Sequence, residues 1–416
     1  MDADLAEMLA ALPAVALEGA KAVGKTRTAE RVARSVFALA SRNVLLNVEA
    51  DPAAVAAAAE PVLLDEWQRA PWIWDEVRQW VDQEPRPGRF VLTGSSAPRG
   101  ARIHSGAGRI LPIRMRPLSL AERLEGGGVS LGRLLGDGEA SPVAGESKLR
   151  LADYVDEILR SGFPAIRDLP VHARDRALDG YLEAVVAKEF PEQGLTVRKP
   201  QLLRGWMRAY ALASGSTASY TTILDAATWG VGDKPSKAQT LAYRDTLASL
   251  WLVDPVPAWD AAGTGLATPL VKASKHYLAD PALAARLADM TSNTLFAGPG
   301  PDPLGLQGGS LLGRLFESLV ALSLQTYAAA CGAKLFHLRT VSGHREVDFV
   351  VQRGRSIVAL EVKLAAAALD KDVRHLNWLE SALPGQVAAK VCVTTGPRAY
   401  TRPDGVHVVP AALLRP

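Results

Sequence analysis

This sequence has few cysteines, no basic residues near its N-terminus and no long apolar runs. It contains only two cysteines, Cys331 and Cys392, with no CxxC pair and no histidine cluster. This scarcity excludes a disulfide framework and a structural zinc site, so we expect both to be small apolar core residues. The N-terminal segment is acidic where a signal peptide needs positive charge, and no run of about 18 apolar residues occurs. We therefore expect a cytoplasmic protein with no membrane partner.

A strong charge of one sign is also missing. The 416 residues include 47 Lys and Arg against 44 Asp and Glu, a net charge of +3. A nucleic-acid partner would therefore have to be bound by a local basic patch. With 48% hydrophobic and 22% charged residues the composition is that of a globular chain, and its length predicts two or three domains.

Short apolar runs alternate with helical patterns over residues 14–125. Such runs are typical of strands that are buried on both faces of a parallel sheet. The alternation predicts a doubly wound α/β domain. We expect strands within 14–19, 43–50, 61–67, 89–96 and 109–115, and helices over 25–40 and 72–83.

A glycine-rich turn follows the first of these strands. Residues 19–26 fit the pattern GxxxxGK[ST], in which backbone N–H groups and a helix N-terminus bind phosphates. Lys25 would reach the β- and γ-phosphates of ATP, and the Thr26 hydroxyl would bind Mg²⁺. The residues that we expect to bind the nucleotide are Gly19, Ala22, Val23, Gly24, Lys25, Thr26, Arg27, Asp65 and Ser95.

An apolar strand that ends in Asp65 and Glu66 supplies the second half of this site. Asp65 would hold Mg²⁺ through its water shell, and Glu66 would orient and deprotonate the attacking water. Taken alone, the two acids also fit a solvated turn. Together with the glycine-rich turn they predict a site for ATP and Mg²⁺.

Residues at two further places in the sequence have either a role in hydrolysis or a purely structural role. Thr93 or Ser95, at the end of a third strand, would sense the γ-phosphate or cap the next helix. Arg109 would serve as an arginine finger across a subunit interface, or is a surface arginine beside a strand.

Four charged residues stand out near the C-terminus. Alternation places Glu361 and Lys363 on one face of a strand, and a turn at residues 353–355 brings the strand of Asp348 alongside. Glu317 lies upstream in an apolar helix. We predict that Glu317, Asp348 and Glu361 bind Mg²⁺ and that Lys363 orients the attacking water, as in metal-dependent phosphodiesterases. A solvated strand face is the alternative for Glu361 and Lys363 alone.

The middle of the chain, residues 196–297, shows three helical patterns followed by extended segments. That order suits a winged helix-turn-helix, with Lys234, Lys237 and Arg244 contacting DNA phosphates. A packing module with solvated lysines is the alternative.

The order of these motifs over nearly the whole chain resembles bacterial and archaeal AAA+ family ATPases with a C-terminal domain of unknown function. The resemblance rests on GAKAVGKT, VLLDEW, LTGSS, YLEAVVAKEF and GRLFESLV with EVDFVV and ALEVK. It implies an α/β fold class with a P-loop AAA+ domain, a helical and winged-helix middle and a restriction-endonuclease-like C-terminal domain of PD-(D/E)XK type. Two departures are Val347 where the nuclease motif has proline, and Glu189 where an aspartate is expected.

The patterns along the chain give domain boundaries, and the resemblance adds a function. We expect a P-loop core at 1–125, a helical lid or connector at 126–195, a winged-helix-like domain at 196–297, a linker at 298–309 and a nuclease-like domain at 310–416. The leading hypothesis is an AAA+ ATPase that binds, remodels or cuts branched DNA or DNA ends, assembled as a hexameric ring. The alternatives are a regulatory nucleotide switch in toxin–antitoxin or defence systems, with an inert C-terminal docking domain, and a nuclease gated by ATP.

Overall fold

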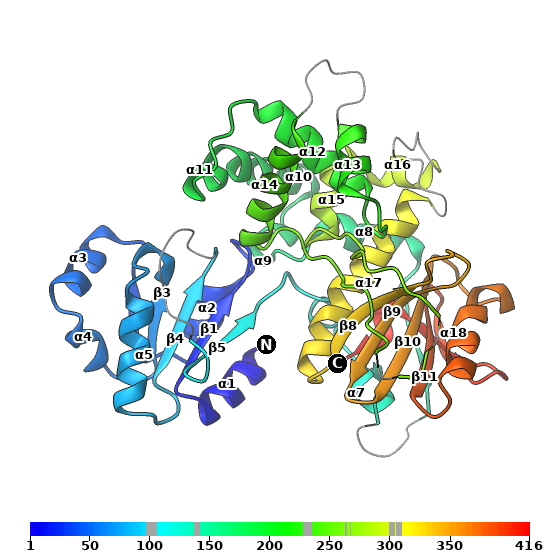
Figure 1. Ribbon diagram of the computed structural model, residues 1–416, viewed down its shortest axis with the longest axis horizontal. Helices are drawn as coiled ribbons and strands as arrows, with labels where there is room; N and C mark the ends of the chain where they lie inside the picture. Colours follow the sequence, from blue (N-terminus) through cyan, green and yellow to red (C-terminus); the bar gives the residue numbers. More distant parts are fainter. Residues whose placement is uncertain are drawn as a thin grey trace.

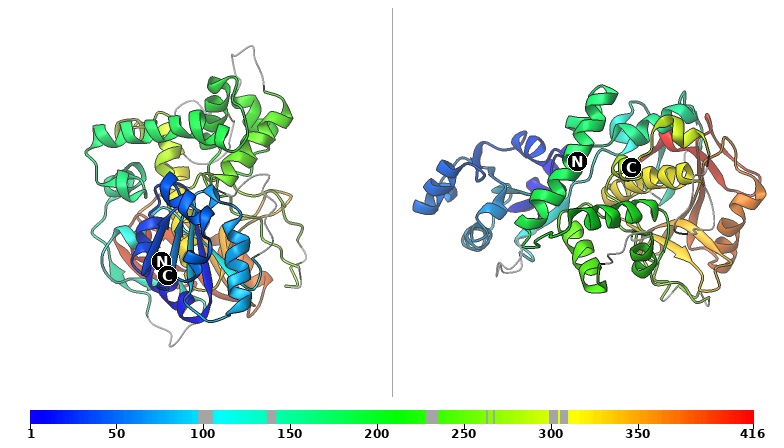
Figure 2. Two further views of the ribbon diagram at one scale, coloured as in Figure 1. Left: turned by 90° about the vertical axis from the view of Figure 1, so that its left-hand side faces the viewer. Right: turned by 90° about the horizontal axis from the view of Figure 1, so that it is seen from above.

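The structure is a computed structural model that describes residues 1–96, 106–136, 142–227, 235–262, 264–266, 268–298, 304 and 310–416. It has an N-terminal α/β domain, a layer of helices and a second α/β domain at the C-terminus (Figure 1). Seen from the side and from above, the helical layer lies over and between the two α/β domains (Figure 2). None of the helices described is both long and apolar enough for a membrane span.

The N-terminal domain contains a five-stranded parallel sheet in the order β2-β3-β4-β1-β5. Because every pair of neighbours is parallel, the carboxyl ends of all strands meet at one edge, where ligands bind in such sheets. The strands are β1 Ala14–Glu18, β2 Ser35–Ala38, β3 Val62–Asp65, β4 Phe90–Gly94 and β5 Ile110–Arg114.

Helices cover both faces of this sheet. Leu5 and Leu9 of α1 pack with Ala29 of α2 on one face, and Val48 of α3 and Val77 of α5 pack on the other. The helices are α1 Asp2–Ala11, α2 Lys25–Glu30, α3 Arg42–Ala50, α4 Ala53–Ala56, the 3-10 helix η1 Trp67–Arg69 and α5 Ile73–Gln83.

Two predicted elements in this domain are wrong. Residues 43–50 belong to helix α3 instead of a strand, and the second strand is Ser35–Ala38, which we had placed in the helix at 25–40. Val48 is buried while Leu46 is 51% exposed, so the apolar run is one face of a helix. β2 is an edge strand that pairs only with β3 and is half-buried, so it lacks the apolar run of a central strand.

The segment after the first sheet crosses to the C-terminal domain. Its strand β6 pairs with β14, and its strand β7 pairs with β12, so residues of this connector complete the distant domain. The elements are α6 Leu120–Arg123, β6 Val129–Ser130, α7 Leu131–Leu134 and β7 Gly145–Glu146.

The helical layer consists of α8 to α16. After α14, the chain forms antiparallel bridges between Val253 and Leu278 and between Val256 and Lys275. Three helices followed by paired extended segments is the order that we predicted, but the winged-helix assignment stays a prediction. The helices are α8 Leu151–Arg160, α9 Pro164–Arg167, α10 Val171–Ala184, the π-helix η2 Val185–Glu189, α11 Phe190–Glu192, α12 Pro200–Leu212, α13 Tyr220–Ala227, α14 Lys237–Ser249, α15 Pro281–Leu287 and α16 Ser292–Phe296.

The C-terminal domain is a mixed seven-stranded sheet in the order β7-β12-β13-β11-β10-β9-β8. Helix α17 packs on one face with Leu360 and Val391, and α18 packs on the other with Ala359 and Cys392. Its own elements are α17 Leu311–Ala330, β8 Lys334–Arg339, β9 Glu346–Arg353, β10 Ser356–Lys363, α18 Asp370–Ala382, β11 Val387–Thr394, β12 Arg398–Thr401, β13 His407–Pro410, the 3-10 helix η3 Ala411–Leu413 and β14 Leu414–Arg415.

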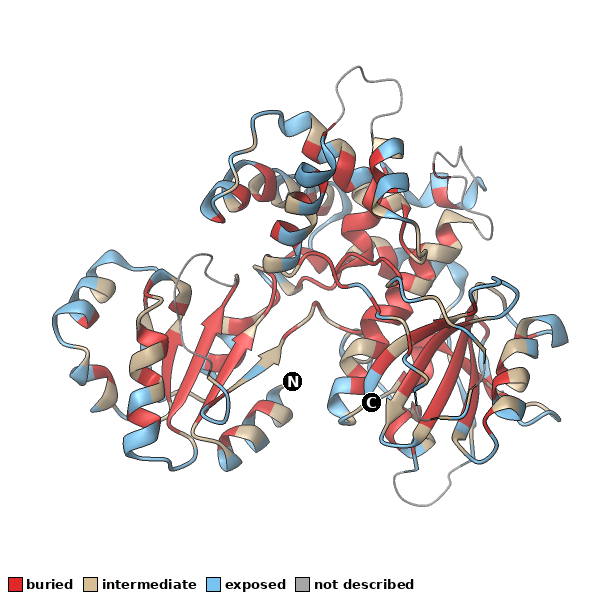
Figure 3. Cartoon of the chain, in the orientation of Figure 1, coloured by how far each residue is buried: buried red, intermediate tan, exposed pale blue. Residues whose placement is uncertain are grey.

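One apolar core joins the helical layer to the C-terminal domain. It includes Tyr154 of α8, Trp206 of α12, Leu283 of α15 and Phe316 of α17. Figure 3 shows that buried residues extend from the helices into the second sheet, whereas the first sheet has a separate buried centre. The linker that we predicted at 298–309 lies outside the described residues, apart from Gly298 and Leu304.

Candidate functional site

The loop between β1 and α2 lies at the carboxyl edge of the first sheet and bends as a phosphate-binding loop must. Gly24 and Ala22 adopt positive φ angles of 106° and 67°. At Gly19, an added Cβ would lie 2.1 Å from the carbonyl oxygen of Met115, so only glycine fits. α2 begins at Lys25, which places a helix N-terminus at the end of the loop.

Lys25 folds back onto its own loop. Its Nζ donates hydrogen bonds to the carbonyl oxygens of Gly19 at 2.8 Å and Ala20 at 2.9 Å. Burial lowers the pKa of Lys25 to about 8, although the carboxylates of Glu66 and Asp65 act in the opposite direction. A bound anion at this loop would restore a full counter-charge to the ammonium group.

Asp65, at the end of β3, links helix α2 and strand β4 at the same edge. Its Oδ1 accepts hydrogen bonds from the Thr26 hydroxyl at 2.7 Å and from the Thr93 hydroxyl at 2.5 Å. A hydroxyl and a carboxylate at the end of a phosphate-binding loop are the oxygen donors that Mg²⁺ takes with a nucleotide. The residues present at this edge therefore fit a magnesium–nucleotide complex.

Glu66 is held in a fixed position next to Asp65. Its backbone has a positive φ of 58°, and its N–H donates to the Thr93 hydroxyl at 3.2 Å. Its Oε2 accepts from Gln68 Nε2 at 2.5 Å and from the Ser95 hydroxyl at 3.2 Å. Ser95 was predicted from the sequence, but Gln68 was missed, because a polar residue after a strand carries no distinctive pattern.

Two predicted residues lie away from these contacts. Arg27 is exposed and pairs with Glu30 at 3.3 Å. Arg109 precedes β5, whose first residue pairs with Ala14 at the start of β1, so it sits at the edge opposite the phosphate-binding loop. It forms an ion pair of 2.7 Å with Asp82 of α5. Within one chain Arg109 is therefore a surface arginine, and its role across a subunit interface stays a prediction.

The phosphate-binding loop is attached to the helical layer. Lys21 forms an ion pair with Glu189 of the π-helix, and the Tyr181 hydroxyl donates to the Lys21 carbonyl oxygen at 3.2 Å. Ala20 and Val23 are buried in the core of the helical layer and not in the cores of the first sheet. The loop thus belongs structurally to both domains.

A second ion-pair cluster links the same sheet edge to the segment after α14. Asp254, whose side chain is 6% exposed, pairs with Arg114 at 2.8 Å and with Arg116 at 2.7 Å. Arg114 is the last residue of β5 and pairs in register with Glu18, just before the phosphate-binding loop. Both clusters therefore connect the carboxyl edge of the sheet to the helical layer.

In the C-terminal domain, the predicted charged residues do come together. The turn at Gly354 pairs β9 with β10 in antiparallel register, and Lys363 contacts Glu361 at 2.7 Å on the same strand face. The Val362 N–H donates to Asp348 Oδ2 at 2.9 Å. The local strand geometry that we expected for Asp348, Glu361 and Lys363 is therefore present.

A residue that sequence reasoning missed lies in the middle of these carboxylates. Lys275 is 1% exposed, and its Nζ lies 2.8 Å from Glu317 Oε1, 3.0 Å from Asp348 Oδ1 and 3.4 Å from Glu346 Oε1. Tyr277, two positions on, donates its hydroxyl proton to Glu317. No signal in the sequence marks Lys275, because it comes from an irregular segment of the middle region.

Lys275 competes for the oxygens that the predicted Mg²⁺ would need, although Glu361 Oε2 is buried with no hydrogen-bond partner among the described residues. The Asp348 oxygens are bonded to Lys275 and to Val362 N–H, and Glu317 Oε1 is bonded to Lys275 and Tyr277. Across the described part of the chain, no group of three or more His, Cys, Asp or Glu side chains is placed to hold a metal ion. No phosphodiester chemistry through a metal follows from this cluster.

Burial and mutual repulsion alter the protonation of the two glutamates. The pKa of Glu317 is raised to about 7 and that of Glu361 to about 8, mainly by burial and further by the charge of Asp348. The pKa of Asp348 is lowered, because Lys275 and Lys363 outweigh the effect of its burial.

Three family profiles match successive parts of the chain. An AAA domain matches residues 12–124, a domain of unknown function, DUF8612, matches residues 151–294, and another, DUF4143, matches residues 312–414. No curated protein matches the chain.

Solved structures with a similar chain include two archaeal proteins. The Walker-type ATPase of Pyrococcus abyssi is 14% identical over 69% of this chain and 94% of its own, with a TM-score of 0.36. The ORC2 protein of Aeropyrum pernix, in ADPNP and ADP complexes, is 15% identical over 71% of this chain and 93% of its own, with a TM-score of 0.29.

The first domain thus has the glycine-rich loop and the acidic strand end of a P-loop nucleotide site, within the part of the chain that matches an AAA domain. More narrowly, residues 12–124 are similar to AAA domains, and they precede two regions that match families of unknown function.

Proposed function

We propose that this protein is a magnesium-dependent ATPase that converts its nucleotide state into movement between its N-terminal domain and the rest of the chain. The observation that carries this proposal is the double attachment of the phosphate-binding loop. Lys21 of the loop pairs with Glu189, and Ala20 and Val23 pack in the core of the helical layer. A loop that closes around phosphates must therefore displace, or strain, the helices to which it is attached.

The site residues divide the hydrolytic work among them. Lys25 would leave the carbonyl oxygens of its loop to bind the β- and γ-phosphates, and Thr26 and Asp65 would hold Mg²⁺, which would neutralise phosphate charge. Glu66 accepts the proton of the attacking water, and Ser95 keeps its carboxylate in place. The assigned roles agree with the hydrogen bonds that already order this edge.

The experiment that tests the proposal measures hydrolysis and movement separately. Lys25→Ala is expected to abolish ATP binding, and Glu66→Gln is expected to keep binding but lower kcat by roughly 100- to 10,000-fold. Fluorophores on α5 and α18 would report the domain movement by energy transfer on addition of ADP or a non-hydrolysable ATP analogue.

Glu189→Gln tests the coupling itself. It removes the nearer of the two charges that pair with Lys21, the other being Glu192 at 3.6 Å, so we expect a smaller nucleotide-dependent change in energy transfer with nucleotide binding retained. Glu183→Gln, on the neighbouring helix and paired with Arg204 at an exposed position, serves as the matched control. If Glu189→Gln and Glu183→Gln give the same change as wild type, the double attachment does not transmit the nucleotide state.

DNA is the partner proposed from the sequence, together with a hexameric ring. The support from the structure is limited to Lys237, which is exposed on α14, because Arg244 pairs with Asp245 at 2.7 Å and Lys234 lies outside the described residues. Binding assays with duplex, single-stranded and forked DNA, with and without an ATP analogue, test this part. Equal affinity of wild type and Lys237→Ala for every DNA would remove the predicted contact.

One observation favours the second candidate, a regulatory nucleotide switch with an inert C-terminal docking domain. The ammonium group of Lys275 lies among the carboxylates that a nuclease would need for its metal. Under this candidate Lys363→Ala leaves the biological activity intact while Lys25→Ala abolishes it. ATP-dependent cleavage of DNA that is lost in Lys363→Ala would decide against it.

A further inference from the structure

The carboxylate cluster of the C-terminal domain already contains a positive charge that belongs to the chain. Lys275 Nζ contacts one carboxylate from α17, Glu317, and two from β9, Asp348 and Glu346. It also lies 5.7 Å from the centre of the Phe349 ring, on whose face a cation is attracted. The group is thus enclosed by acceptors and an aromatic ring and has almost no contact with solvent.

The distances are those of an ammonium group and not of a space for a divalent ion. Separations of 2.8 and 3.0 Å from Glu317 and Asp348 are normal for charge-assisted hydrogen bonds. Mg²⁺ instead needs oxygens at about 2.0–2.1 Å in octahedral geometry. A metal bound by Glu317 Oε1 and Asp348 Oδ1 would have to displace Lys275 from both of its shortest ion pairs.

Lys275 comes from a different layer of the fold than the carboxylates that it contacts. The residue lies in an extended segment between α14 and α15 that forms a bridge with Val256, so it comes from the helical layer. In the same segment, Tyr277 bonds to Glu317, and His276 on the opposite side contacts the carbonyl oxygen of Ala218 at 2.8 Å. Alternation therefore directs Lys275 and Tyr277 to the carboxylates while His276 stays with the helices.

We propose that Lys275 is the permanent cation of this cluster, which makes the cluster a joint between the helical layer and the C-terminal domain and not a metal-dependent phosphodiesterase centre. In this assignment the ammonium group neutralises Glu317 and Asp348, a task that a divalent metal performs in a nuclease. The joint is complete within one chain, and the C-terminal domain needs no metal to be stable.

The first test measures metal binding by the full chain without nucleotide. Mn²⁺ is titrated into chelator-treated wild type and Asp348→Asn, and the free ion is followed by electron paramagnetic resonance. We expect the same number of Mn²⁺ ions bound in both proteins. A wild-type site for one Mn²⁺ that disappears in Asp348→Asn would overturn the proposal, whatever happens at the phosphate-binding loop.

The second test asks whether Lys275 holds the joint together. Lys275→Met keeps the length of the side chain but leaves the carboxylates without their cation, so we expect the melting temperature to fall by on the order of 5–10 °C. Lys272→Met, at an exposed position of the same segment, is the matched control and is expected to change it by less than about 2 °C. Equal effects of the two substitutions would contradict the assignment.

A double variant keeps the test decisive if Lys275→Met folds poorly. Asp348→Asn removes one of the charges that Lys275 neutralises, so we expect Lys275→Met with Asp348→Asn to melt higher than Lys275→Met alone. If the double variant's melting temperature falls by the sum of the falls of the two single variants, the groups act independently and the proposal is overturned.

Discussion

At the scale of single residues, Gly19 shows how closely the phosphate-binding loop is fitted to the chain behind it. The Cβ of an alanine would lie 2.1 Å from the Met115 carbonyl oxygen, a backbone atom that cannot rotate away. Gly19→Ala is therefore expected to displace the loop and weaken ATP binding roughly 100-fold, a loss of about 2–3 kcal/mol. Isothermal titration calorimetry with ADP and ATP measures this change.

The matched control is Gly180→Ala in α10. An added Cβ there meets no atom within 4 Å, and alanine favours a helix. We expect unchanged nucleotide affinity and an unfolding free energy that stays equal or rises by up to about 1 kcal/mol. Equal affinities of the Gly19→Ala and wild-type proteins would contradict the close fit.

Gln68 illustrates a residue that acts through another one. Its amide donates to Glu66 Oε2 at 2.5 Å and to the Ser95 hydroxyl at 3.0 Å, so it positions the carboxylate that we assign as the base. We expect Gln68→Leu to lower kcat roughly 10- to 100-fold with KM for ATP nearly unchanged. Gln83→Leu, at the exposed end of α5, is the control, and a rise in KM at constant kcat would assign Gln68 to binding instead.

The sequence predicted some residues of the two sites and not others for a physical reason. Lys25, Thr26, Asp65 and Glu66 lie in short motifs, where the chemistry of phosphate binding fixes the spacing along the chain. Lys275 meets Asp348 only because two distant segments pack together, and nothing in either segment encodes the contact. A buried lysine is also rare enough that composition argues against it.

At the scale of elements, the same difference explains which strands were predicted. β1, β3 and β4 are central and buried on both faces, so an apolar run marks each one. The edge strand β2 was predicted as helix and the amphipathic helix α3 as strand, because a half-buried strand has fewer apolar residues than the apolar face of a helix. The central strands were therefore easier to predict than the elements at the edge of the sheet.

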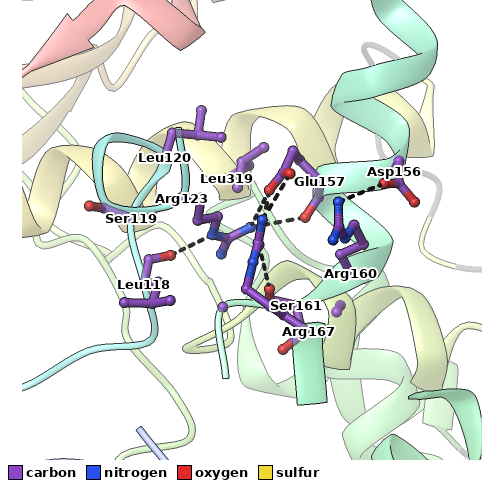
Figure 4. A network of polar contacts seen from close by, with 12 residues as sticks. Leu118, Ser119, Leu120, Arg123, Asp156, Glu157, Arg160, Ser161, Arg167 and Leu319 are labelled. Atoms are coloured by element: carbon purple, nitrogen blue, oxygen red, sulfur yellow. Dashed lines mark hydrogen bonds and ion pairs between the residues drawn. The ribbon is translucent and has the colours of Figure 1, made fainter. Parts of the chain in front are cut away.

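The junction between α8, α9 and the connector contains a buried network of charges (Figure 4). Arg167 holds both oxygens of Glu157 at 3.1 Å, and Arg123 donates to the Glu157 carbonyl oxygen at 2.9 Å. Asp280 completes the group by accepting from Gly162 N–H at 2.6 Å. Because these charges are removed from water, each depends on its partners.

Glu157→Gln is expected to lower the unfolding free energy by about 3–5 kcal/mol, because it removes the charge that Arg167 contacts through both of its Nη atoms. Chemical denaturation followed by circular dichroism measures the loss. Arg204 and Glu183 form an exposed pair at 3.2 Å, so Glu183→Gln is the control, with an expected change of about 0–1 kcal/mol. A loss for Glu157→Gln as small as that for Glu183→Gln would mean that water reaches the network.

At the scale of the whole molecule, the cores divide the chain differently from the boundaries predicted by sequence. The first sheet has its own two clusters, whereas the helical layer, the connector and the C-terminal domain share one large cluster. The strands β6 and β7 of the connector also pair with the C-terminal domain. Composition and linkers cannot reveal such sharing, because it arises from segments that meet only in the folded chain.

This division predicts two heat-induced transitions in differential scanning calorimetry. A ligand stabilises the unit that binds it, by about 2.7 kcal/mol at a hundredfold excess over Kd. We expect Mg²⁺ with ADP to raise the transition of the first domain by about 10 °C and that of the larger unit by much less, since among the described residues of the loop Ala20 and Val23 alone lie in its core. Lys25→Ala is expected to remove the shift. A single transition that moves as a whole with nucleotide would mean instead that the two units unfold as one, and that the attachment of the loop is strong enough to make the entire chain cooperative.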